Sequence, residues 1–171
     1  MALSMYDVSV PTFQQLLGGL SEVIDKAAAH CAEKKIEPAA LITARLFPNM
    51  YTFARQVQAT TQHATNVTAR LIGQEPPALP EAAAGFDDLK ARVAKALEYL
   101  ASIKPDQMQG SETKDIEVKR GTGPMIFSGR NFLFCFVLPN FYFHVTTAYD
   151  ILRHNGVVLA KSDFMGKFDP K

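Results

Sequence analysis

Asn140 and His144 are the residues in this sequence best suited to chemistry, and they lie in an aromatic-rich, apolar stretch. Their spacing of four residues places both side chains on one face of a helix. Histidine is a common metal ligand, and two side chains at this spacing can share one ion. An asparagine oxygen binds hard cations but holds zinc or nickel weakly. The alternative is a buried pair satisfied by hydrogen bonds within the protein.

Pro139 gives the same stretch a second unusual feature, because a proline inside a helix donates no backbone hydrogen bond. In a regular α-helix the carbonyl of Cys135 would lose its donor. The side chain of Asn140 or His144 could serve this region, and so could a ligand. A kink that follows the curvature of a helical bundle is the simpler interpretation, and the sequence does not separate the two.

A second group of polar side chains occurs in the apolar segment 49–72. Gln58 and Gln62 share one helix face, and His63 lies on the flank of the apolar stripe. His63 could turn inward toward His144 or lie at the wet edge of the fold, and the edge is the commoner location. His63 and His144 are the candidate metal ligands. The predicted ligand pocket consists of Gln58, His63, Asn140 and His144.

No motif in the sequence assigns a catalytic residue. The glycine-rich segment Gly121–Pro124 lacks the Lys-Ser/Thr pair of a phosphate-binding loop. Spacing alone nominates no Ser-His-Asp arrangement, and His30 and His154 near helix ends are expected to have structural roles. Whether the protein is an enzyme therefore stays open. A divalent metal, zinc or nickel, is the one candidate cofactor.

The composition limits the classes of partner. The chain has 18 basic and 17 acidic side chains, a net charge of +1, which leaves no electrostatic footprint for nucleic acid or an anionic membrane. No apolar run approaches about 18 residues, so no membrane span is expected. Cys31 and Cys135 lie far apart in a chain without a recognisable secretion signal, which predicts two buried, reduced thiols and a cytoplasmic location.

The apolar spacing predicts the helices that would position these residues in a single domain, residues 1–171. Steps of three and four recur through the long helices expected at 9–35, 49–72, 85–103 and 129–154. A shorter helical piece is expected at 38–46, a β-hairpin at 116–127 and an irregular tail at 157–171. The paired Gly18 and Gly19 would permit close helix approach. The sequence thus predicts an all-α four-helix bundle with a β-hairpin before its last long helix.

Several segments resemble a bacterial and fungal family known as domain of unknown function 1993. They are Ser4–Tyr6, Val10–Phe13, Arg55–Gln58, His63–Ala64, Arg70–Gly73 and Leu138–Val157. The resemblance spans nearly the whole chain, and this family looks like a distant branch of the DinB/YfiT-like superfamily. It implies a DinB-like up-down four-helix bundle and a homodimer. Many members of that superfamily are metalloenzymes, some of them thiol-S-transferases or hydrolases.

The resemblance also implies positions for a metal site. In the superfamily, three histidines hold a divalent metal: one from the second long helix, and a His-x-x-x-His pair from the last. Aligning Leu152-Arg153 and Gly156 places the second histidine of that pair on His144 and the first on Asn140, which is a departure. The remaining histidine falls within 58–63. We therefore expect a modified pocket around Asn140 and His144 that binds a small ligand or partner. The alternative is a divalent-metal-dependent enzyme of thiol-transferase or hydrolase type.

Overall fold

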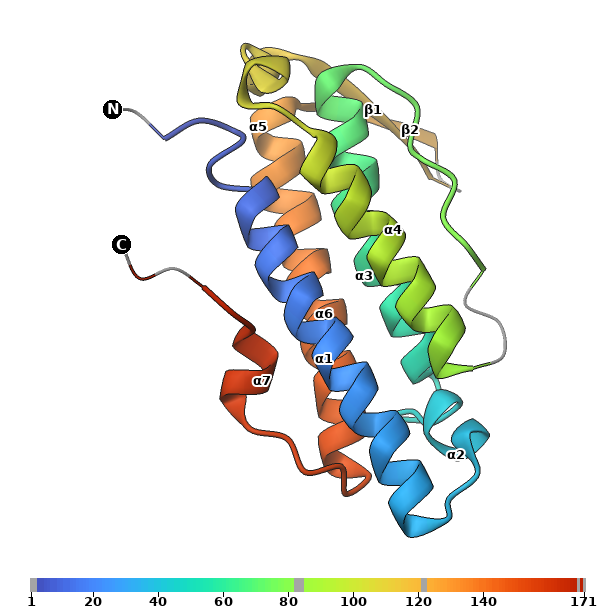
Figure 1. Cartoon of the computed structure of the whole chain (residues 1–171). Coiled ribbons are helices and arrows are strands. Elements are labelled where there is room, and N and C mark those ends of the chain that lie inside the picture. The colour runs from blue at the N-terminus through green and yellow to red at the C-terminus, as the bar shows by residue number, and fades with distance from the viewer. Residues whose placement is uncertain (1–2, 82–84, 121–122, 169, 171) are drawn as a thin grey trace.

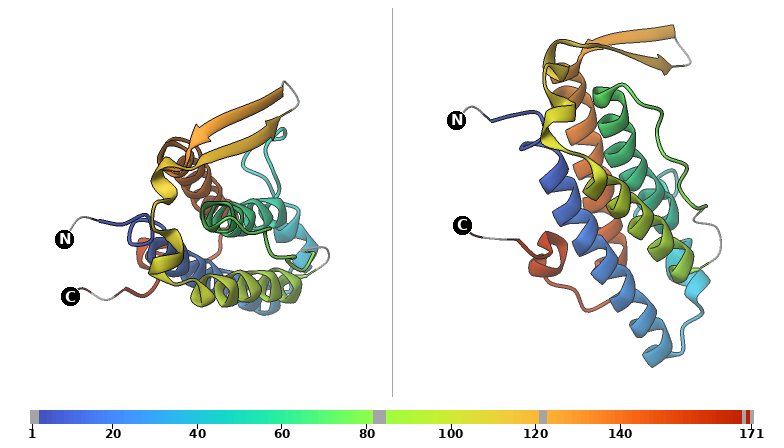
Figure 2. Two further views of the ribbon diagram at one scale, coloured as in Figure 1. Left: turned by 90° about the horizontal axis from the view of Figure 1, so that it is seen from above. Right: turned by 45° about the horizontal axis from the view of Figure 1, so that its top comes forward.

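Four long helices form the bundle in the computed structural model, which describes residues 3–81, 85–120, 123–168 and 170. The helices are α1 (Val10–Lys34), α3 (Phe53–Ile72), α4 (Phe86–Ser102) and α6 (Leu138–His154). α1 and α4 lie side by side in one layer, and α3 and α6 form the other (Figures 1 and 2). The predicted four-helix bundle is confirmed.

The connection between α3 and α4 returns the chain along the length of the bundle (Figure 1). As a result α3 and α4 run in the same direction (Figure 1). Between these two helices, Arg92 Nε of α4 donates to Thr61 Oγ1 of α3 at 2.8 Å. This crossover modifies the simple up-down order. It leaves α6 packed against α3 along the interface that carries the predicted site residues.

α3 begins at Phe53, later than the start expected near residue 49. Thr52 is the N-cap, and its hydroxyl accepts a hydrogen bond from the backbone N–H of Arg55 at 3.3 Å. Gly73 ends the helix with a positive φ of 76°, a conformation that glycine adopts without steric cost. The cap places Arg55 and Gln56 in the first turn of α3, beside α6.

The last long helix is not one continuous α-helix. It starts as α5 (Gly129–Asn131), where the side chain of Ser128 accepts a hydrogen bond from the backbone N–H of Asn131. The helix then continues as the π-helical segment η3 (Phe132–Val137) before α6. The core row Leu133, Val137, Phe141 and Val145 steps by four residues, which would drift about 40° per step around a regular α-helix. The wider π turns help to keep this row on the core.

The smaller elements close the ends of the bundle. The predicted hairpin is confirmed as β1 (Asp115–Arg120) paired antiparallel with β2 (Gly123–Ser128), and turn residues 121–122 lie outside the described residues. Two 3-10 turns, η1 (Pro105–Met108) and η2 (Ser111–Thr113), precede it, and the short helix α2 (Pro38–Ile42) joins α1 to α3.

The C-terminal segment forms a short helix, α7 (Lys161–Met165), so the prediction of an irregular tail was wrong there. α7 packs on α1, where a Cβ on Gly19 would lie 2.9 Å from the carbonyl oxygens of Asp163 and Phe164. The close approach predicted for the glycine pair is therefore real at Gly19, but the approaching partner is this C-terminal segment. A Cβ on Gly18 would meet nothing within 4 Å.

The two cysteines differ in exposure. Cys31 is buried and Cys135 is exposed, so the predicted burial of both thiols was wrong for Cys135; both are free. Cys135 lies in the π-helical segment, where the residues that face the core are Phe132, Leu133 and Val137.

The helical stretch Gly129–His154 is long and apolar enough to cross a membrane by length and composition alone. It packs as a bundle helix against α3, which suits a soluble protein.

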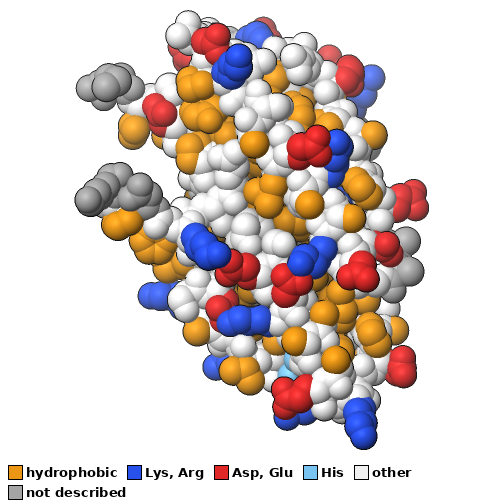
Figure 3. Space-filling view, viewed as in Figure 1, with side chains coloured by type: hydrophobic (Ala, Val, Ile, Leu, Met, Phe, Trp, Pro, Cys, Tyr) orange, Lys and Arg blue, Asp and Glu red, His pale blue; other side chains and the backbone are white. Residues whose placement is uncertain are grey.

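Charged side chains of both signs are interspersed on the face shown in Figure 3. The pattern there agrees with the near-neutral net charge of +1. This face therefore lacks the single-sign surface that a nucleic-acid phosphate backbone requires.

Candidate functional site

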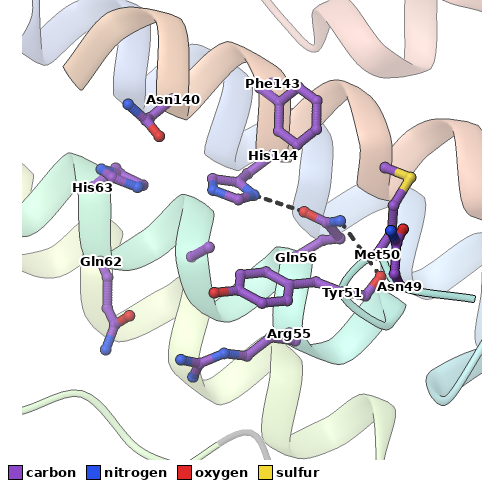
Figure 4. A pocket seen from close by; sticks show the side chains of 11 residues that line it. Asn49, Met50, Tyr51, Arg55, Gln56, Gln62, His63, Asn140, Phe143 and His144 are labelled. Atoms are coloured by element: carbon purple, nitrogen blue, oxygen red, sulfur yellow. Dashed lines mark hydrogen bonds between the residues drawn. The ribbon is translucent and has the colours of Figure 1, made fainter. Parts of the chain in front are cut away.

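A cavity of about 440 Å³ lies between α3 and α6, near the start of α3 (Figure 4). It brings together three of the four predicted pocket residues: His63, Asn140 and His144. Its wall also includes residues of the turn before α3 and of the first turns of α3. The lining residues are Asn49, Met50, Tyr51, Arg55, Gln56, Ala59, Gln62, His63, Asn140, Phe143 and His144.

Hydrogen bonds define the tautomer of His144. Gln56 Nε2 donates to the backbone carbonyl of Tyr51 at 3.4 Å, so its Oε1 faces His144 Nδ1 at 2.7 Å (Figure 4). An amide oxygen only accepts, and Nδ1 must therefore carry the proton. Burial and the nearby positive charge of Arg55 lower the pKa of His144, which keeps the ring neutral. The lone pair on Nε2 faces the side of the pocket that holds His63 and Asn140 (Figure 4).

Asn140 has one end tied to the backbone of its own helix. Its Nδ2 donates to the carbonyl of Phe136 at 2.6 Å, close to the Pro139 position where the helix lacks a backbone donor. Its Oδ1 is directed into the pocket, toward the space beside the two histidine rings (Figure 4). Asn140 and His144 therefore do not satisfy each other. Each is held by a different protein group and presents an acceptor to the cavity.

His63 turns inward, so the commoner edge location does not apply. Its ring stacks on that of His144, with centroids 5.4 Å apart and an interplanar angle of 15°. Burial, and to a lesser degree His144, lowers the pKa of His63 from 6.5 to about 4. Both imidazoles are neutral at pH 7 for this reason.

Gln58 is not among the described residues that line the pocket. At 100° per residue it lies about 40° beyond Gln62 around α3, away from the face formed by Arg55, Ala59 and His63. Its Oε1 instead accepts a hydrogen bond from Arg55 Nη1 at 2.7 Å. The Arg55 guanidinium also lies over the ring of Tyr51, 5.4 Å from its centroid. Gln58 acts on the pocket indirectly, by holding Arg55.

The most important residue that the sequence analysis missed is Gln56. It is 1% exposed, which makes it a buried amide on the packed side of α3, where the other buried polar residues are threonines. A polar side chain seven residues before His63, on nearly the same helix face, was the available signal. Arg55 and Tyr51 gave no comparable signal, because an arginine in a first turn and a tyrosine in a loop are ordinary surface residues.

The pocket fits a tightly held divalent metal incompletely. His63 and His144 offer two imidazole nitrogens and Asn140 an amide oxygen, whereas zinc sites use at least three histidine, cysteine or carboxylate ligands. Among the described residues, no group of three or more His, Cys, Asp or Glu side chains is arranged to hold an ion. We therefore derive no chemical step through a metal.

A larger cavity of about 980 Å³ lies toward the other end of the bundle. It is lined by the N-terminal segment, the 3-10 turns and the π segment, including Met5, Met108 and Phe134, and by the exposed Cys135. It contains none of the predicted site residues. Three of the four predicted site residues thus line the smaller cavity, between α3 and α6.

The arrangement of the four long helices defines the chain as a DinB-like bundle. A crystal structure described as a DinB family member protein from Shewanella denitrificans matches 98% of this chain and 94% of that chain, with 34% sequence identity and a TM-score of 0.90. A family model, domain of unknown function (DUF1993), matches residues 5–165, and the chain belongs to this family. No curated protein matches the chain. These findings confirm the resemblance and the fold; they assign no activity.

Proposed function

We propose that the cavity between α3 and α6 binds a small polar ligand. The observation that carries this proposal is the bond between Gln56 and His144, which directs the unprotonated Nε2 of His144 into the cavity. Asn140 supports it, since its amide nitrogen is used by Phe136 and its oxygen faces the same space. Polar groups in a partly buried site are normally hydrogen-bonded, so these acceptors favour a ligand with donors.

The dimensions of the cavity agree with this proposal. A volume of about 440 Å³ lies in the range of pockets that hold small molecules. Tyr51, Phe143 and Met50 supply apolar contact area, while His63, His144 and Asn140 supply polar contacts. A few oriented polar groups set among apolar side chains are typical of specific small-ligand sites.

The test is a ligand screen read out by NMR of the histidine side chains in the full chain. Ligands in the pocket should shift the His63 and His144 imidazole signals saturably. Ala59→Leu should abolish these shifts by filling the cavity from its α3 wall, whereas Ala94→Leu, at an exposed α4 position, should leave them unchanged. If every ligand found in the screen shifts the imidazole signals of Ala59→Leu and of the wild type equally, the ligands bind outside this cavity and the proposal is wrong.

A divalent-metal-dependent enzyme of the thiol-transferase or hydrolase type is the second candidate. The observation that favours it is the pair of neutral, adjacent imidazoles beside an amide oxygen, because only a neutral imidazole can ligate a metal. The test is metal analysis of the purified wild type and of His144→Ala. Absence of stoichiometric zinc or nickel from both proteins would reject this candidate.

We also propose that the protein is a cytoplasmic homodimer. Exposed aromatic side chains of the helical stretch Gly129–His154 support a partner surface, with Phe134 43% and Tyr142 42% exposed. Aromatic residues left in water are enriched where protein surfaces associate. Light scattering of the full chain measures the assembly directly.

A further inference from the structure

We propose that the ligand of this pocket is a small carboxylate that also carries a hydroxyl or amino group. In this arrangement Arg55 binds the carboxylate, and Asn140 and His144 accept hydrogen bonds from the second group. The inference rests on the proposed ligand-binding function and adds the chemical class of the ligand.

The charge of the pocket wall favours an anion. Among the described lining residues, Arg55 is the one Lys or Arg side chain, and no Asp or Glu lines the cavity. Arg55 is itself an exposed residue, and its positive charge attracts a negatively charged group toward the cavity that it lines. A cationic ligand would be repelled by the same guanidinium.

Arg55 is also held in position at the pocket. Gln58 accepts one of its N–H groups at 2.7 Å, and the ring of Tyr51 lies beneath the guanidinium at 5.4 Å. An arginine has five N–H donors, so most remain available after the bond to Gln58. Its planar fork suits a carboxylate, and a guanidinium that is already oriented loses less conformational entropy on binding.

The opposite side of the cavity requires a different ligand group. The Oδ1 of Asn140 and the Nε2 of His144 are both acceptors, and Figure 4 shows them directed toward the same space. An anionic oxygen placed there would face two lone pairs without a proton between them. A hydroxyl or amino group would instead donate to them, and leaving these partly buried acceptors without a donor carries a free-energy cost.

These two requirements exclude simpler ligands. A plain carboxylate satisfies Arg55 but leaves Asn140 and His144 without a donor. A neutral hydroxy-amide satisfies those two acceptors but leaves the charge of Arg55 unmatched. A bifunctional ligand satisfies both sides, and its selectivity over each simpler analogue follows from the group that the analogue lacks.

The experiment uses three matched probes: mandelate, phenylacetate without the hydroxyl, and mandelamide without the charge. Their common aromatic ring has apolar contacts available at Tyr51 and Phe143. Binding is followed by titration of the His63 and His144 imidazole NMR signals. Mandelate should bind about tenfold or more tightly than either analogue, the range expected for losing one hydrogen bond to a charged or buried group.

Variants test whether Arg55 causes the preference for mandelate over mandelamide. Arg55→Gln should weaken the binding of mandelate by about tenfold or more and leave the affinity for mandelamide nearly unchanged. The preference for the charged probe should therefore disappear. Arg153→Gln, an exposed arginine in the last turn of α6, is the matched control and should leave all three affinities unchanged.

The outcomes separate the two proposals. Equal affinity for mandelate and mandelamide, or no effect of Arg55→Gln on mandelate, would overturn the inference about ligand class while leaving a ligand-binding pocket. A preference for phenylacetate over mandelate would overturn the role of the two acceptors. If none of the probes, and no other compound in the ligand screen, moves the imidazole signals, the ligand-binding function itself is wrong.

Discussion

His63 should make the stability of this protein depend on pH between neutral and mildly acidic conditions. Burial and His144 lower its pKa from 6.5 to about 4 in the folded state. As the pH falls below 6.5, the unfolded chain binds a proton at this residue that the folded chain does not bind. Stability is therefore lost as the pH falls toward 4, and the loss is complete below that value.

The magnitude follows from the two pKa values. Proton linkage for one group with pKa values of 6.5 unfolded and about 4 folded lowers the free energy of unfolding by about 2 kcal/mol between pH 7 and pH 5. For a chain of 171 residues that corresponds to a fall of about 4–8 °C in the unfolding temperature. The lowered pKa of His144 acts in the same direction, so the wild-type loss should be at least this large.

The assay is thermal and denaturant unfolding at pH 7 and pH 5, a window chosen above the ordinary range of most carboxylate titrations. His63→Gln removes the titrating ring and should reduce the pH-dependent loss by about 1–2 kcal/mol. His154→Gln, at an exposed position, should retain the wild-type loss. Equal losses in His63→Gln and wild type would refute the buried, neutral state of His63.

Three further predictions concern the metal, the packing and the assembly. Asn140→His should bind stoichiometric zinc or nickel, because it completes a set of three histidines. Equal metal contents in the purified variant and wild type would contradict this prediction. Gly19→Ala should destabilise the protein by about 1–3 kcal/mol in denaturant unfolding, because its Cβ would meet carbonyl oxygens at 2.9 Å. Gly18→Ala, with nothing within 4 Å, should be neutral or about 0.5–1 kcal/mol stabilising, and an equal cost at both positions would reject this packing argument. Phe134→Glu places a charge at an exposed aromatic position and should convert the dimer to a monomer, as measured by light scattering. A wild-type protein that is already monomeric would show that the dimer proposal is wrong.

The long helices were predictable because their apolar residues repeat at the helical period over many turns. The five-residue α7 was not, since so short a helix has little periodicity and depends on tertiary packing. The π segment was also missed. The core row at steps of four was visible in the sequence, but whether a helix coils, bends or widens to keep such a row buried depends on its neighbours.

For the site, the sequence by itself determined the polar residue types and the helix face they share: Asn140 and His144 on one helix and His63 on another. The tertiary structure decided their state. Packing of α3 against α6 turned His63 inward, and it brought Gln56 to His144 Nδ1 across 88 residues of sequence. Tautomer, pKa and orientation depend on burial and on contacts between helices, and helical spacing within a single segment contains no information about either.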